Sequence, residues 1–221
     1  MSEFETGGGN KATNPSERVT RHLLADRLYH WLMAIVVLVL MGSAFLPILD
    51  IKFQWVETHW ISGMLLVVLL AIHIVRSIFW QDWRSMMIGV SDVRDIWRGM
   101  CRALGCSGAV PARPGKYDPF QKLYHLGMAL LVLAVAGSGL PMLLKIDTPF
   151  WRRDPYWFSN ETWGIIYAVH GFAAMAIVTM VMIHVYFALR PDEWHLTRSM
   201  FRGWISRKEY SEHHDAERWK A

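Results

Sequence analysis

The sequence predicts an all-α, polytopic membrane protein built as a bundle of four transmembrane helices. Hydrophobic residues make up 53% of the 221 residues, with 12 Trp and 13 Met, which is more apolar than an ordinary soluble domain. Lys and Arg also lie mainly on alternate connections between apolar runs. Four such runs approach the length that crosses a bilayer: residues 28–49, 60–80, 123–144 and 165–189.

The basic residues predict how the chain is oriented. Four Lys or Arg precede the first run, eight lie at the end of the second run or before the third, and seven follow the fourth. The two other connections hold only four. Because Lys and Arg accumulate on the cytoplasmic side, we expect both termini and the long middle loop in the cytoplasm, and the chain in a bacterial inner membrane. The formal net charge of +4 then reports topology and not a nucleic-acid partner.

Composition divides the chain into three parts. Residues 1–17 are polar and Gly-rich, which predicts a disordered cytoplasmic lead. Residues 18–190 hold the four helices, and residues 191–221 form a basic, amphipathic cytoplasmic tail expected to rest on lipid headgroups. In the middle loop, apolar residues at three- and four-residue steps predict a surface helix over 91–104, with Asp92 as its cap.

Histidines recur at a fixed spacing inside the apolar runs. His170 and His184 are fourteen residues apart, which is about 21 Å along a helix and within about 40° of four whole turns. His59 and His73 repeat this spacing in the second run. An ionisable side chain inside a membrane span is costly without a partner, so it indicates function. The recurrence predicts two cofactors stacked across the membrane.

Sorting the histidines by depth predicts their partners. His59 and His170 start helices that run inward, so they lie near the outer face. A haem held by two histidines needs imidazoles on opposite sides of one iron, and His59 with His170 is the only pair available there. On the inner side, His184 pairs either with His73, which repeats the outer arrangement, or with His30 or His125. The histidines expected at that inner level are His30, His73, His125 and His184.

Other metals fit the pattern less well. Zinc or copper sites usually add Cys or carboxylate ligands, and none clusters with these histidines at membrane depth. Cys101 and Cys106 lie in the middle loop and are expected to be ordinary reduced thiols. The chain has no C-x-x-C-H motif, so a haem would be held without covalent attachment. We expect His22, His213 and His214, outside the spans, to be solvated.

Several segments between residues 18 and 219 resemble the membrane cytochrome b (gamma) subunit of respiratory formate dehydrogenases. The wider group includes cytochrome b subunits of thiosulfate reductases and nickel-iron hydrogenases. The segments that carry the resemblance are Asp26-Arg27 followed by Tyr29-His30-Trp31, the His59 helix ending at Arg76, KYDPFQKLYH from Lys116, HGFAAMAIVTMVMIHVYFAL from His170 and MFRGWISRKEYSEHH from Met200.

The resemblance implies a diheme subunit and not a complete enzyme. Such a subunit takes electrons from an extracytoplasmic iron-sulfur subunit, which serves a molybdenum catalytic subunit, and passes them to menaquinone or ubiquinone at the cytoplasmic side. Carried over by position, His59 and His170 hold the outer haem. His30 and His184 hold the inner haem, although the internal repeat favours His73 with His184.

The resemblance also implies a quinone region before the third helix. The family pattern resembles K-Y-N-x-G-Q, whereas this chain has Asp118 and Phe120 at the Asn and Gly positions. Tyr117, Asp118 and Gln121 are therefore candidate quinone contacts. His73 and His125 are additional to some family members, and their candidate roles are quinone contact, proton relay or ligation of an extra haem.

Three alternative functions remain open at this level. The same module would serve another periplasmic enzyme, such as a thiosulfate reductase or hydrogenase, with quinol as the electron donor. A haem-free membrane anchor would use its histidines for hydrogen bonds to helix backbones. A stand-alone quinol oxidase would act on a small diffusible oxidant.

Overall fold

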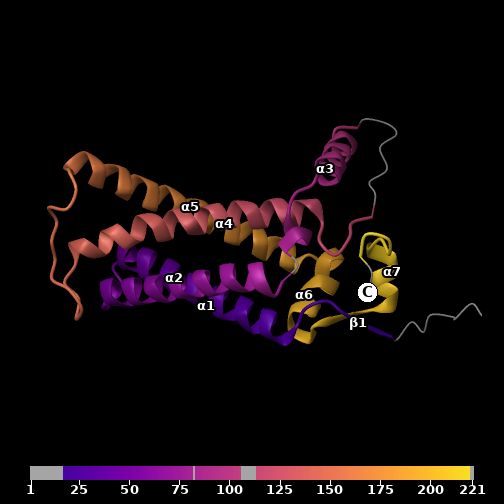
Figure 1. The fold of residues 1–221 in the computed structure, drawn as a ribbon, viewed down its shortest axis with the longest axis horizontal. Helices are drawn as coiled ribbons and strands as arrows, with labels where there is room; N and C mark the ends of the chain where they lie inside the picture. The colour runs from indigo at the N-terminus through magenta and orange to yellow at the C-terminus, as the bar shows by residue number, and fades with distance from the viewer. Residues whose placement is uncertain (1–16, 82, 106–112, 220–221) are drawn as a thin grey trace, which may run out of the picture.

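The computed structural model describes residues 17–81, 83–105 and 113–219. Within these residues, four helices are long and apolar enough to cross a membrane, which confirms the predicted all-α architecture. They are α1 (Leu24–Phe45), α2 (Trp55–Phe79), α4 (Pro119–Met142) and α5 (Asn160–Leu189), and the elongated bundle that they form is drawn in Figure 1. Two of these spans extend through short 3-10 helices, η1 (Leu46–Leu49) after α1 and η3 (Leu143–Lys145) after α4.

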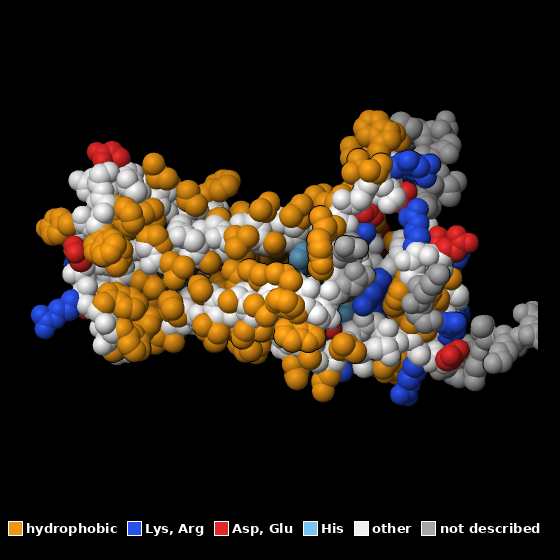
Figure 2. Space-filling view, viewed as in Figure 1, with side chains coloured by type: hydrophobic (Ala, Val, Ile, Leu, Met, Phe, Trp, Pro, Cys, Tyr) orange, Lys and Arg blue, Asp and Glu red, His pale blue; other side chains and the backbone are white. Residues whose placement is uncertain are grey.

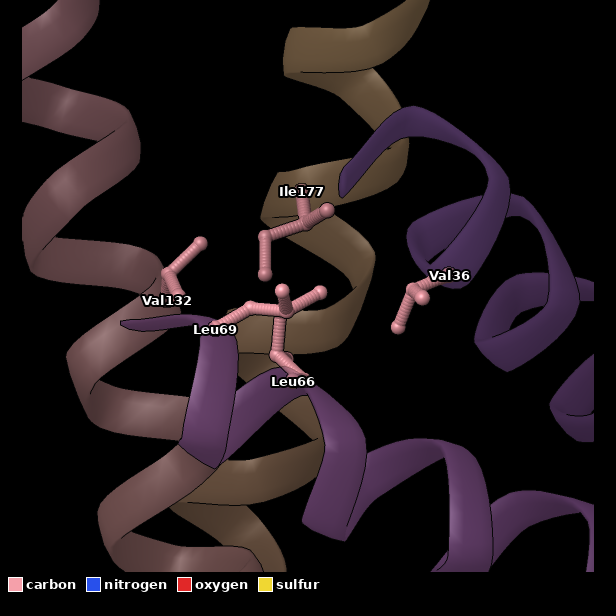
Figure 3. Close-up of a cluster of buried hydrophobic side chains, with 5 residues drawn as sticks. All are labelled: Val36, Leu66, Leu69, Val132 and Ile177. Atoms are coloured by element: carbon pink, nitrogen blue, oxygen red, sulfur yellow. The ribbon is translucent and has the colours of Figure 1, made fainter. Parts of the chain in front are cut away.

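The four helices pack as two antiparallel hairpins. α1 packs mainly on α2, and α4 packs mainly on α5, so the hairpins meet along a seam (Figure 1). Side chains from all four helices form the buried core in that seam (Figure 3). The outside of the bundle is covered with apolar side chains, as expected of a surface that faces lipid (Figure 2). The core residues are Val36, Leu66, Leu69, Val132 and Ile177.

Each long helix begins four or five residues before the predicted apolar run. The first turns contain polar or charged residues, which do not raise hydrophobicity, and in α4 and α5 a polar side chain also caps a free backbone N–H group. Asp118 caps α4 by accepting a hydrogen bond from the backbone N–H of Phe120 at 2.8 Å. Ser159 caps α5 by accepting one from Thr162 at 3.3 Å. The apolar run therefore marks the part of each helix that can lie in the membrane and not the start of the helix.

The two ends of the bundle differ in charge. Lys and Arg gather at the end that carries residues 17–23 and 190–219, which we call the basic end (Figure 2). The opposite end is formed by residues 46–54 and 143–159, which we call the loop end. The elements after α5 all lie at the basic end (Figure 1): η4 (Pro191–Glu193), α6 (Trp194–Arg202), β2 (Trp204–Ser206) and α7 (Arg207–His213).

A two-stranded sheet joins the start of the described chain to its tail. β1 (Arg18–Thr20) pairs antiparallel with β2, with Val19 opposite Ile205. Val19, Ile205 and Tyr210 form a small buried core, against which Trp219 packs. This sheet was not predicted. The pairing links the predicted tail 191–221 to the residues that precede α1, while residues 1–16 of the predicted lead lie outside the described residues.

One prediction about the tail is wrong. His213 is exposed, as expected, but the side chain of His214 is only 6% exposed. Its Nδ1–H donates to the carbonyl of Gly115 at 2.8 Å, and its Nε2 accepts from a guanidinium N–H of Arg21 at 3.1 Å. The charged residues next to His214 in the sequence indicated exposure to solvent. Its burial depends instead on Arg21, which lies almost two hundred residues away in the sequence. His22 is half-buried and not fully solvated.

The middle loop contains the predicted amphipathic helix as α3 (Val90–Ala103), preceded by the 3-10 helix η2 (Trp83–Met86). Asp92 is not the cap residue. The helix is capped at Gly89, whose N–H donates to the Asp92 carboxylate at 2.8 Å, and this carboxylate also pairs with Lys122 of α4 at 2.9 Å. Cys101 lies in α3, whereas Cys106 lies outside the described residues.

Candidate functional site

Two predicted ligands face one another near the loop end. The ring centroids of His59 on α2 and His170 on α5 lie 6.3 Å apart, with their planes at 72°. The two residues come from different hairpins, so their rings meet across the seam. We call them the loop-end pair.

Buried serines orient both rings of the loop-end pair. Ser43 donates to the carbonyl of Leu40, so its oxygen accepts from Nδ1–H of His59 at 2.9 Å. Ser138 likewise donates to the carbonyl of Ala134 and accepts from Nδ1–H of His170 at 3.1 Å. With Nδ1 protonated, each neutral imidazole keeps its lone pair on Nε2, the nitrogen then available to a metal.

The other four membrane histidines form two pairs at the basic end. His30 on α1 and His184 on α5 have ring centroids 6.2 Å apart, with planes at 51°. His73 on α2 and His125 on α4 lie 6.1 Å apart, with planes at 57°. We call these the first and second basic-end pairs. The structure thus brings His184 beside His30, and it does not place His73 beside His184.

The separation within each pair is that of two imidazoles sharing one metal. Two metal–nitrogen bonds of about 2.0 Å and two ring radii of about 1.1 Å give about 6.2 Å between centroids. Imidazoles joined by a direct hydrogen bond would lie about 1 Å closer, because their nitrogens would be about 2.9 Å apart. Separations of 6.1 to 6.3 Å are too long for such a bond in all three pairs.

The residues around the pairs fit haem better than a bare metal ion. Among the described residues, no group of three or more His, Cys, Asp or Glu side chains is placed to hold a metal ion. A pair of axial imidazoles is sufficient for haem, because the macrocycle supplies the other four nitrogens. His30 Nδ1 is buried without a hydrogen-bond partner in the described part of the chain. Gly139 also leaves room for the loop-end pair, since a Cβ there would lie 3.2 Å from Cε1 of His170.

The serines and two tyrosines around the pairs were missed in the sequence analysis. Tyr29 stacks on His73 at 5.3 Å and donates to the carbonyl of Leu69, while Tyr124 stacks on His184 at 5.6 Å and donates to the carbonyl of Met180. A signal was present in the sequence, because a Tyr-His dipeptide is followed twelve residues later by Gly-Ser in both α1 and α4. The repeated dipeptides are Tyr29-His30 with Gly42-Ser43, and Tyr124-His125 with Gly137-Ser138.

The candidate quinone residues lie where α4 begins. Asp118 and Gln121 form its capping box, in which Gln121 accepts from the N–H of Asp118 at 3.2 Å. Burial raises the pKa of the Asp118 carboxyl. Tyr117 lies beside Arg21, whose guanidinium carbon is 5.9 Å from the ring centroid. Asp118 and Gln121 thus have capping roles that require no bound quinone.

Four membrane-spanning helices with paired, metal-spaced histidines in their seam define a membrane cytochrome of the b type. The chain belongs to the prokaryotic cytochrome b561 family, whose family model matches residues 21–203. It is similar to the cytochrome b556(fdo) subunit of formate dehydrogenase from Escherichia coli K12, with 25% identity over 213 residues that cover 92% of each chain. The subunits of the same name from E. coli O6:H1 and O157:H7 match to the same extent.

These comparisons confirm the resemblance found in the sequence motifs and show that the relationship is distant. Family membership implies that the chain binds haem b and acts as a membrane electron-transfer protein.

Proposed function

We propose that the chain is a diheme electron-transfer subunit that connects an extracytoplasmic iron-sulfur and molybdenum enzyme, of the formate dehydrogenase type, with membrane menaquinone or ubiquinone. His59 and His170 hold one haem, and His30 and His184 hold the other. The observation that supports this most directly is the ring separation of 6.3 and 6.2 Å in two pairs at opposite ends of one bundle.

The side chains of the bundle position these groups. When bound, haem supplies one-electron transfer at its iron. Ser43 and Ser138 hold the loop-end imidazoles in one tautomer. Ile177 lies midway between His170 and His184 in the sequence and belongs to the buried core, so an apolar layer separates the two levels. Along α5, those levels are about 21 Å apart.

The proposed orientation places the basic end in the cytoplasm. The catalytic partner then meets the loop end, where the connection 146–159 is rich in exposed aromatic side chains, Phe150, Tyr156 and Trp157 among them. Quinone then binds at the basic end, where Tyr117, Asp118 and Gln121 lie at the start of α4 and protons arrive from the cytoplasm. The relationship to a formate dehydrogenase subunit supports this choice of partner.

The ligand assignment predicts that His59→Ala and His170→Ala each remove one haem, and that His30→Ala and His184→Ala each remove the other. The reason is that a single imidazole retains haem much less firmly than a pair. Pyridine haemochrome content and reduced-minus-oxidised spectra of the purified chain would measure the loss. His213→Ala is the matched control, because this exposed histidine should leave haem content unchanged. A wild-type chain without b-type bands would refute the proposal.

Copurification tests the partner separately. Affinity purification of the chain from its own membranes should recover iron-sulfur and molybdenum polypeptides. Recovery of a nickel-iron polypeptide instead would keep the cytochrome assignment but overturn the formate dehydrogenase type.

A further inference from the structure

The second basic-end pair is not used by the proposed two-haem function. His73 and His125 join α2 to α4, whereas His30 and His184 join α1 to α5, so the two basic-end pairs bridge different pairs of helices across the seam. Their ring separations and plane angles are nearly the same, 6.1 Å and 57° against 6.2 Å and 51°.

The internal repeat explains this likeness. In the repeat, α1 corresponds to α4 and α2 to α5, so that His30 corresponds to His125 and His184 to His73. Exchange of the two hairpins therefore converts the first basic-end pair into the second. The loop-end pair is converted into itself, because His59 corresponds to His170.

Contacts around the two basic-end pairs repeat in the same register. Tyr29 reaches the carbonyl of Leu69, four residues before His73, at 2.8 Å. Tyr124 reaches the carbonyl of Met180, four residues before His184, at 3.1 Å. Each tyrosine also stacks on that histidine, with planes at 16° and 25°. The surroundings that support His184 as a ligand are therefore also present around His73.

Hydrogen bonding does not account for the second basic-end pair. At 6.1 Å between centroids, the two rings are too far apart to share a proton directly. Within the described residues, neither ring is hydrogen-bonded to another protein group. Both rings belong to membrane-spanning helices, where a polar side chain without a partner is costly and indicates function.

We propose that His73 and His125 are the axial ligands of a third b-type haem, at the same depth as the haem of His30 and His184. The inference rests on the proposed function and extends it, because a site in the repeated half of the bundle takes the same cofactor. The chain then carries one haem near the loop end and two near the basic end.

The test is the haem content of the complete chain, purified from its native membrane and quantified as pyridine haemochrome per polypeptide. Wild type should carry three haems. His73→Ala and His125→Ala should each reduce the content to two-thirds of wild type, and the double variant should lose no more than either single one. His73→Ala combined with His30→Ala should leave one-third.

Two further variants keep the test decisive. His125→Met retains a side chain that can bind haem iron, so this variant should keep three haems. One component of its redox titration should shift to higher potential. This variant also provides a test if an alanine variant fails to fold. His213→Ala should retain three. A content of two haems in wild type, or of three haems in His73→Ala, would overturn the third site and leave the diheme function intact. Fewer than two in wild type would overturn the proposed function itself.

Discussion

Two buried serines control how the loop-end histidines present their nitrogens. Ser43 and Ser138 are 2% and 7% exposed, and each uses its own proton on a carbonyl of the preceding helical turn. Each oxygen can then only accept from an imidazole Nδ1–H. Because the rings are fixed in this tautomer before haem binds, the cost of ordering them is already met by folding.

We predict that Ser138→Ala weakens haem binding at the loop-end pair by about 10- to 100-fold, the range typical when the group that orients a ligand is removed. The imidazole of His170 would then be free to rotate or change tautomer. Haem dissociation to an acceptor protein would measure the effect. Thr179→Ala is the control, because Thr179 also donates to a carbonyl of α5, that of Met175, but is exposed and contacts no histidine. Equal dissociation from the two variants would contradict the role given to Ser138.

At the scale of elements, the sheet of β1 and β2 ties the beginning of α1 to the tail through Arg21 and His214. Arg21 is buried and donates both to Nε2 of His214 at 3.1 Å and to the carbonyl of Lys116 at 2.8 Å. Arginine can only donate and a carbonyl can only accept, so His214 fits between Arg21 and Gly115 only when it is neutral.

Acid should therefore loosen this unit. Burial and, as the second cause, the charge of Arg21 lower the pKa of His214 to about 4. Burial and the charges of Arg21 and Lys116 lower the pKa of His22 to about 3. Between pH 6.5 and 4 the unfolded chain binds protons that the folded chain does not, so stability falls as pH falls. At pH 5 the loss is up to about 2 kcal/mol for His214.

The rate of amide hydrogen exchange in residues 17–22 and 204–214, corrected for intrinsic rates, should increase as the pH falls from 7 to 5. His214→Gln should reduce the pH dependence, since a glutamine amide both accepts from Arg21 and donates to Gly115 without titrating. His213→Gln should leave it unchanged. If exchange in His214→Gln depended on pH as strongly as in wild type, His214 would not be the group responsible.

The sequence predicted the long elements well because their apolar runs are long and continuous. It did not predict the sheet, because two three-residue strands almost two hundred residues apart carry no alternating pattern of their own. The burial of His214 depends on the same long-range contact. The pairing at the basic end was left open between three partners for His184, because depth alone does not say which helices are adjacent across the seam.

On the scale of the whole molecule, the bundle consists of two helical hairpins that share a sequence pattern along the seam. The seam keeps Tyr-His, Gly-Ser and the fourteen-residue histidine spacing in both halves. The basic residues instead follow the membrane sides, with four of the 23 on the two connections of the loop end. Charge and histidine pattern therefore report independent properties, orientation and cofactor binding.

Orientation predicts which surface of the bundle a membrane-impermeant reagent reaches. In a background with both native cysteines replaced by Ser, Tyr156→Cys at the loop end and Leu104→Cys after α3 provide matched probes, because these side chains are 91% and 80% exposed. In intact spheroplasts, an impermeant maleimide should label Tyr156→Cys and not Leu104→Cys, and in inverted vesicles the result should reverse. The reason is that the two connections of the loop end carry four of the 23 Lys and Arg, so translocating them is more favourable than translocating the segments that carry the other 19. The opposite labelling would place the catalytic partner and the quinone on the wrong sides, even if every haem ligand were correct.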